Sequence, residues 1–317
     1  MAVYSTHPRY SLFILAVLAA TVYLLALYDP DPAILGTTLR NLNAYDLPGR
    51  LERSKRIYTK LLHERQGLIK KFGPAPKDIV LFPPNVQPWP PYTVWDFFPA
   101  AFNCPHEIQR LGALGDGGKW VCGASRVEKK KDCIVYSVGI NYESSFEAEL
   151  LEQTEHCEIW GYDFTVNSFG PQIPTKHASR THFSPYGLAG KDSHGPDDNP
   201  KMYTLDSLMK MNGHTHIDIL KIDIERWEFE TLSALIKPYL ESRRPLPFGQ
   251  LQLEIHLWNI TFEDFLSWWE MLEAAGLRPF WTEPNLVYQN YNRAGSTDLA
   301  EYSFLNIKGH NVFIKDD

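Results

Sequence analysis

Residues 218–232 read DILKIDIERWEFETL. The first half of this segment is short and mostly apolar, which is typical of a buried strand in a parallel sheet. Apolar residues then continue to Leu240 with the spacing of a helix. This order places Asp223 and Glu225 at the carboxyl end of the strand, where open α/β sheets bind ligands. A solvated strand-to-helix turn is the alternative interpretation of the two acids.

The same alternation of strand and helix patterns runs through residues 101–317. A capping-box pattern at Ser144 and Glu147 predicts the start of one helix, and further helices are expected over 205–211, up to Leu240, and over 262–275. The predicted strands are 133–139, 157–164, 181–188, 217–224, 250–257, 278–282, 301–307 and 311–315, the last two as a hairpin. We therefore expect a doubly wound parallel sheet with an antiparallel hairpin at one edge.

The first two strands end in residues suited to a nucleotide-like ligand. Gly139 and the helix after it predict a turn whose free backbone N–H groups face an anion. Asp163 ends the next strand, 24 positions after Gly139. In nucleotide-binding α/β folds an acid at about this spacing binds the ribose hydroxyls. A helix cap or a turn residue is the alternative for Asp163 taken alone.

The composition limits the number of domains and the kinds of partner that the chain can have. The chain has 317 residues, 44% of them hydrophobic, which is ample for a core in one large or two small domains. Its net charge of −7 provides no general basic surface, so nucleic acid is not an expected partner.

The N-terminal region predicts a membrane anchor. Residues 11–28 contain no charge and are just long enough to span a bilayer. A cleaved signal peptide is the alternative, but the length favours a retained anchor. Arg9 precedes the span and Asp29 follows it, so residues 1–10 are expected in the cytosol and the body in the lumen. The short span suits the endoplasmic reticulum or Golgi.

Residues 29–100 are predicted to be a stem. A basic amphipathic helix over 50–71 is expected to lie on a membrane, to lie on the catalytic domain, or to be solvated. The proline-rich segment 73–91 predicts an extended linker.

The cysteines and a sequon agree with a lumenal body. Cys133 and Cys157 precede the ends of the first two strands by equal distances, so they would form a cross-strand disulfide or pack as thiols. Cys104 and Cys122 are the remaining pair, and reduced core thiols are the alternative for all four. Asn259 begins an N-glycosylation sequon.

Several separate motifs, in order along residues 101–317, resemble known methyltransferases. Those that resemble FkbM-type S-adenosylmethionine-dependent methyltransferases are YSVG (136–139), YD (162–163), LDSL (205–208) and LKIDIE (220–225) with Glu228. Those that look more like the membrane-anchored methyltransferase-like protein 24 group are GDGGKWVC (115–122), SFE (145–147), EIH (254–256), EPN (283–285) and EYSFLN (301–306). The resemblance implies a Rossmann-like, seven-stranded class I methyltransferase fold whose strand order reverses between the first and fourth strands.

The resemblance also implies S-adenosylmethionine as cofactor and a set of residues around it. The methionine end would lie at Ser137 and Gly139, the ribose at Asp163, the adenine near residues 186–188, and the sulfonium beside Asp223. The full implied set is Lys119, Trp120, Ser137, Gly139, Asn141, Asp163, Phe164, Gly187, Leu188 and Asp223. The turn departs from the family pattern in having a single glycine, followed by the bulky Tyr142.

Methyl transfer to a hydroxyl needs positioning and a general base. His256, which titrates nearest neutral pH, is the first candidate, followed by Glu225 and then Glu254; a packed structural histidine is the alternative for His256. No metal is expected, and a divalent cation on Asp223 with Glu225 or His256 is a minor alternative.

The predicted function is O-methylation of an unidentified acceptor in the secretory pathway. One rival is a type II membrane glycosyltransferase that uses Asp223 and Glu225 for a metal-bound sugar nucleotide. The other is a methyltransferase-like domain that binds without catalysing.

Overall fold

The computed structural model describes residues 46–84, 87–291 and 297–316. The compact unit to which most of the described residues belong begins at Arg50. The predicted anchor, residues 11–28, lies outside the described residues. None of the helices within the described ranges is both long and apolar enough to span a bilayer.

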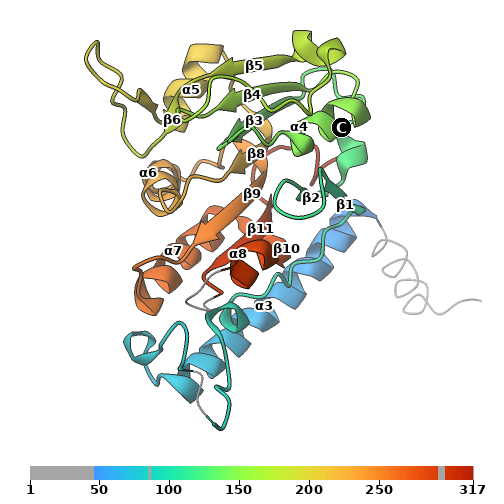
Figure 1. Ribbon diagram of the computed structural model, residues 1–317. Helices are drawn as coiled ribbons and strands as arrows, with labels where there is room; N and C mark the ends of the chain where they lie inside the picture. The colour runs from blue at the N-terminus through green and yellow to red at the C-terminus, as the bar shows by residue number, and fades with distance from the viewer. Residues whose placement is uncertain (1–45, 85–86, 292–296, 317) are drawn as a thin grey trace, which may run out of the picture. The chain divides into compact units, whose positions relative to one another are not determined.

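A seven-stranded mixed sheet forms the centre of the compact unit, in the order β10-β11-β9-β8-β3-β4-β5 (Figure 1). The strands are β3 (Ile134–Val138), β4 (Glu158–Tyr162), β5 (Thr181–Ser184), β8 (Ile217–Ile222), β9 (Phe248–His256), β10 (Leu277–Pro284) and β11 (Leu299–Asn306). β8, β3, β4, β5 and β9 pair in parallel, whereas β11 is antiparallel to both β9 and β10. The order reverses between β3 and β8, as in class I methyltransferases, which confirms the expected topology.

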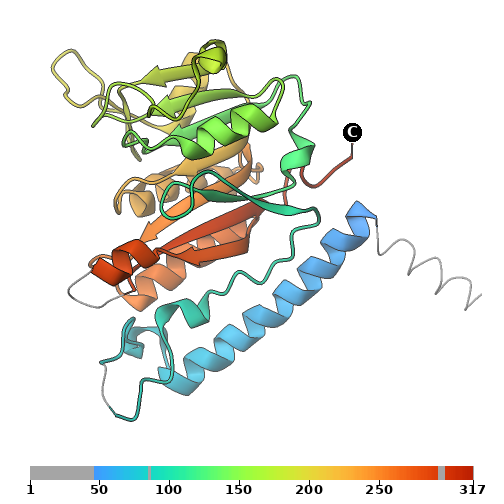
Figure 2. The same ribbon diagram turned by 45° about the vertical axis from the view of Figure 1, so that its right-hand side comes forward.

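Helices cover both faces of this sheet. α4 (Ser145–Gln153) lies on one face, and α6 (Glu228–Glu241) and α7 (Phe262–Ala275) lie on the other (Figure 2). α5 (Leu205–Asn212) precedes β8. α7 has the predicted bounds because both of its ends are locally encoded. Thr261 Oγ1 caps the first turn by accepting from Asp264 N at 3.1 Å, and Gly276 ends the helix at φ 106°.

Two strand predictions were wrong in part. The segment 181–188 breaks after β5 because Pro185 has no N–H for the ladder. β6 (Gly187–Leu188) pairs instead with β7 (Met202–Tyr203) in a separate small sheet. The segment 311–315 forms turns rather than a strand, held by Asn311 Nδ2, which donates to Asn306 O at 3.1 Å. β11 therefore pairs with β10, not with the C-terminal segment.

From Arg50 onward, the basic helix α3 (Leu47–Phe72) belongs to the compact unit, where it contacts α7. Arg65 is buried, and its guanidinium donates to both oxygens of Glu273 in α7 at 3.0 and 2.8 Å. Tyr58 and Trp269 also donate to Glu273. Among the placements that the sequence left open, contact with the domain is the one observed, so the helix belongs to the compact unit.

Among the described residues of the proline-rich segment after α3, the regular structure is a short 3-10 turn, η1 (Pro76–Asp78). Its Ile79 is buried against the core, so this part of the predicted linker also packs on the domain.

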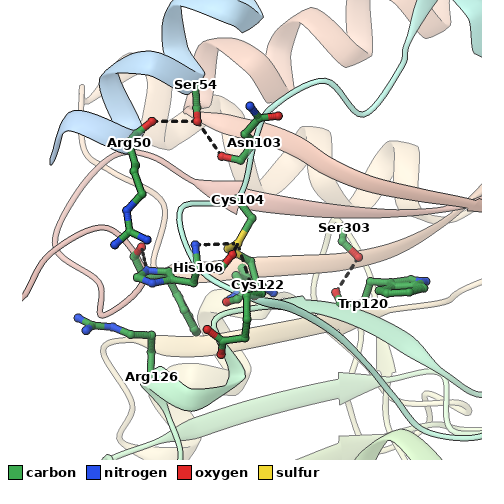
Figure 3. The surroundings of a disulfide bond; sticks show 12 residues. Arg50, Ser54, Asn103, Cys104, His106, Trp120, Cys122, Arg126 and Ser303 are labelled. Carbon is green, nitrogen blue, oxygen red and sulfur yellow. Dashed lines mark hydrogen bonds between the residues drawn. A yellow bond between two sulfur atoms is a disulfide. The ribbon is translucent and has the colours of Figure 1, made fainter. Parts of the chain in front are cut away.

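Both predicted cysteine pairs form disulfides. Cys133–Cys157 joins the starts of β3 and β4, with 4.4 Å between the Cα atoms. Cys104–Cys122 links the segment just before β1 (Ile108–Leu111) to β2 (Lys119–Cys122). β1 and β2 form an antiparallel hairpin. Figure 3 shows Ser54 of α3 bonded to the main chain of Asn103 beside this disulfide, at 2.8 Å.

Candidate active site

The turn after β3 lies directly against the end of β8. Gly139 has φ 80°, and a Cβ added there would stand 1.8 Å from the main-chain oxygen of Asp223. Only glycine fits this position, both for its conformation and for its close approach to the neighbouring backbone. The contact brings the predicted cofactor turn and Asp223 to one place on the carboxyl edge.

Asp163 fills this turn with its own carboxylate. Oδ2 accepts from the main-chain N–H groups of Ile140 and Asn141, both at 2.8 Å. Oδ1 accepts from the main chain and the hydroxyl of Thr165, at 2.7 and 2.6 Å. Burial raises the pKa of Asp163, but these hydrogen bonds outweigh it and lower the pKa below its usual value. The anion that the turn holds is therefore Asp163; its role toward a ribose stays a prediction.

The predicted capping box of α4 does not form. Ser144 makes no side-chain cap; its hydroxyl accepts from Gly170 N at 2.9 Å. Glu147 is fully buried and accepts from the Ser137 hydroxyl. Lys221 Nζ lies 3.6 Å from Glu147 and donates to Gly139 O at 2.8 Å. Glu147 thus forms a polar network beneath the turn rather than a local cap, because a buried lysine needs a counter-charge.

The adenine side of the expected site is an exposed aromatic ring beside a small residue. Phe164 follows Asp163 and its side chain is 49% exposed. A Cβ at Gly187 would lie 2.9 Å from the Phe164 ring, so the two expected residues are in contact. Leu188 is buried, whereas Asn141 is exposed at the turn.

Lys119 and Trp120 lie toward the opposite side, at β10 and β11. Lys119 is buried and its ammonium donates to Glu301. Burial lowers the pKa of Lys119, but Glu301 and then Asp223 outweigh it and raise the pKa. Trp120 stacks on Trp281 with ring centroids 4.1 Å apart. Both residues are engaged within the chain, and their place in the implied cofactor set stays a prediction.

Three of the predicted residues meet at the ends of β8 and β9. Asp223, Glu225 and His256 each place one carboxylate or imidazole atom within 4.8 Å of the others. His256 Nε2 is 3.4 Å from Glu225 Oε2, and its Nδ1 is 3.2 Å from Glu228 Oε1. Burial lowers the pKa of His256, but the hydrogen bond and charge of Glu228 outweigh it and raise the pKa to about 9.

Glu254 lies beside this group, two residues before His256 on β9. It is buried opposite Glu301 of β11 and accepts from Asn285 Nδ2 at 2.9 Å. Burial, then the charges of Asp223 and Glu301, raise the pKa of Glu254 to about 9. Burial likewise raises the pKa of Glu225. The result is an acid-rich edge of the sheet at which burial and neighbouring negative charges favour the protonated form of Glu254.

The sequence interpretation gave no role to Glu228, Glu301 or Asn285. Each stands inside or next to one of the quoted motifs, which was the available signal. Their roles arise from pairing across strands: Glu301 is the Cα partner of Glu254, although 47 positions separate them in the chain. Such pairings are invisible to local periodicity.

The sheet order and the clustering of ligand-type groups at the carboxyl edge define a Rossmann-like fold of the methyltransferase type. A family model described as a methyltransferase domain matches residues 83–295. The chain therefore belongs to this methyltransferase family.

Solved structures provide more distant likenesses. The fibrillarin pre-rRNA processing protein of Methanococcus jannaschii is 13% identical over 56% of this chain and 67% of its own, with a TM-score of 0.33. The methyltransferase FkbM of Methylobacillus flagellatus KT is 15% identical over 55% of this chain and 44% of its own, with a TM-score of 0.31. A chain of a fibrillarin/Nop5p complex is 11% identical over 57% of this chain and 73% of its own, with a TM-score of 0.32. No curated protein sequence matches the chain.

Proposed function

We propose that this chain is an S-adenosylmethionine-dependent methyltransferase that methylates a hydroxyl of an acceptor. The observation that carries the proposal is the contact between the Gly139 turn and Asp223, which puts the expected cofactor turn next to the group of Asp223, Glu225 and His256. Membership of the methyltransferase family supports the reaction class.

The cofactor would lie along the carboxyl edge from β8 to β4. Its sulfonium would face Asp223, its methionine end would follow Gly139 and Asn141, and its adenine would lie on the exposed ring of Phe164. A ribose would contact Asp163 from outside the turn that this carboxylate already holds.

Activation of the acceptor is assigned to Glu225, His256 and Glu254. Glu225 is the member of this set that reaches solvent, with a side chain 72% exposed, while His256 and Glu254 are buried behind it. An acceptor hydroxyl placed at Glu225 would therefore lie within hydrogen-bond reach of a carboxylate and near the methyl group.

We place the protein in the secretory pathway, anchored by residues 11–28 with its body in the lumen, as a member of the membrane-anchored FkbM-like group. The two disulfides support this placement, because disulfides persist mainly in oxidising compartments. The sequon at Asn259 agrees with it.

A non-catalytic binding module is the second candidate. Asp163 favours it, because four donors of the chain already occupy the carboxylate that would hold the ribose. The two candidates differ in cofactor binding and turnover.

The test is calorimetric titration of the full chain with S-adenosylhomocysteine. Phe164→Ala should weaken binding about 2- to 10-fold, the value of one aromatic contact. Trp89→Ala removes another exposed aromatic, 74% exposed and far from Phe164 in sequence, and should leave affinity unchanged. Absence of binding by the folded wild-type chain would overturn the proposal, as would equal effects of the two variants.

A further inference from the structure

The carboxyl edge gathers three side chains whose atoms are typical metal ligands. One atom from each of Asp223, Glu225 and His256 lies within 4.8 Å of the other two. His256 Nε2 and Glu225 Oε2 are 3.4 Å apart. Ligand atoms about 2.1 Å from one cation stand about 3.0–4.2 Å from each other. The group is thus close to the spacing that one ion requires, and the exposed Glu225 side chain is free to rotate into place.

His256 is oriented in the way that metal-binding histidines are. Glu228 Oε1 accepts from the main-chain N–H of His256 at 2.8 Å and lies 3.2 Å from its Nδ1. A carboxylate accepts hydrogen bonds, so Nδ1 donates its proton to Glu228, and Nε2 is the nitrogen that faces Glu225. A cation bound at Nε2 would take the place of the proton on that nitrogen. Both His256 and Glu228 are almost completely buried. A carboxylate behind the ligating imidazole fixes its tautomer and direction in known metal sites.

The charges around this group leave room for a cation. Lys119 donates to Glu301 and also lies near Asp223, whose charge raises the pKa of Lys119, while Glu254 receives a hydrogen bond from the neutral amide of Asn285. Asp223 and Glu225 therefore add negative charge to a wall that already contains buried carboxyl groups. A bound cation would offset that charge more fully than a single imidazolium, since it would carry two positive charges at the point where the acids converge.

We propose that Asp223, Glu225 and His256 together bind one divalent cation, with Glu228 positioning the imidazole. Two carboxylates and one imidazole suit Mn²⁺ and similar ions of intermediate hardness. Three protein ligands leave coordination positions open at the edge of the sheet, where oxygen atoms of an acceptor can bind. Two members of this site, Glu225 and His256, are also residues to which the proposed function assigns acceptor activation, but cation binding itself does not depend on that function.

The probe is Mn²⁺, added to the chelator-treated full chain and followed by loss of the free-ion electron paramagnetic resonance signal. The wild-type chain should bind one Mn²⁺. Glu225→Gln should weaken this binding at least tenfold, and because Glu225 is exposed the variant should fold normally. Asp223→Asn should have a similar effect.

The matched control is Glu158→Gln. Glu158 Oε2 lies 3.1 Å from His182 Nε2, so this pair resembles Glu225 and His256 in spacing and exposure of the acid but belongs to no three-residue group among the described residues. Mn²⁺ affinity should be unchanged in this variant. The proposal is overturned if the wild type binds no Mn²⁺, or if Glu225→Gln and Glu158→Gln alter the affinity equally.

Titration of the same samples with S-adenosylhomocysteine separates this proposal from the proposed function. Mn²⁺ binding without S-adenosylhomocysteine binding supports the metal site and refutes the cofactor. S-adenosylhomocysteine binding without Mn²⁺ binding does the reverse.

Discussion

The carboxylate of Asp163 should contribute more to the stability of this domain than any exposed acid. In Asp163→Asn one of the two oxygens becomes an NH₂ group, so two of the four donors around it face another donor. A hydrogen bond to a charged group contributes about 1.5–3 kcal/mol. Loss of two such bonds therefore predicts a destabilisation of about 3–6 kcal/mol, a large share of a typical unfolding free energy.

Urea unfolding of the full chain under non-reducing conditions measures this difference as a shift of the midpoint. Asp192→Asn is the matched control, because the Asp192 carboxylate also accepts from Thr204 N at 2.7 Å and Ser207 Oγ at 2.6 Å, but on an exposed loop. We expect the control to lose no more than about 1 kcal/mol, since exposed surface sites contribute little.

The pH dependence provides an independent check. The pKa of Asp163 is lower in the folded chain than its usual value. The stability that its ionised form provides is therefore complete above the unfolded pKa of about 3.9 and is lost as the pH falls through the lower folded value. The gap between wild type and Asp163→Asn should narrow in that range. A gap below 1 kcal/mol at pH 7, or one that stays constant down to pH 2, would refute the reasoning.

Three further predictions concern the backbone and the cross-links. Removal of Cys133–Cys157 by double substitution to Ala should cost about 3 kcal/mol, because this disulfide closes a loop of 24 residues; thermal unfolding with and without reductant checks it, and an unchanged midpoint would contradict it. Gly139→Ala should cost several kcal/mol more than Gly213→Ala in urea unfolding, since both residues have φ near 80° but only the first would place its Cβ against backbone; equal losses would show that strain alone decides. Arg226→Gly should stabilise the chain by up to about 1 kcal/mol in the same assay, because Arg226 has φ 82°, and a clear loss of stability would count against a strained backbone there.

Much of the fold could be predicted from the sequence because its signals are local. The helix over residues 262–275 was predicted to the residue, since its cap, its apolar stripe and its terminating glycine all lie within the segment. The strand of residues 217–222, with Asp223 and Glu225 after its carboxyl end, followed from a short apolar run bounded by acids. The cysteine pairs followed from the equal distances of Cys133 and Cys157 to their strand ends.

Two features that the sequence interpretation did not settle depend on partners distant in sequence. The capping-box pattern at Ser144 is present in the sequence, but the capping box does not form, because Glu147 instead lies next to the buried Lys221. The placement of the basic helix was left open between a membrane, the catalytic domain and solvent, and it is decided by the pairing of Arg65 with Glu273, 208 positions away.

The sequence alone indicated most of the strands and helices of the central sheet, the order in which they alternate, and which acids and histidine stand near strand ends. Periodicity, turn residues and caps act over a few residues, so the linear chain contains that information. The tertiary structure alone decided that Asp163 closes its own turn, that Glu228 orients His256, and that Glu254 faces Glu301. A buried charge is stable only where the fold supplies its partner, and the identity of that partner depends on the three-dimensional arrangement of strands and not on neighbours in the chain.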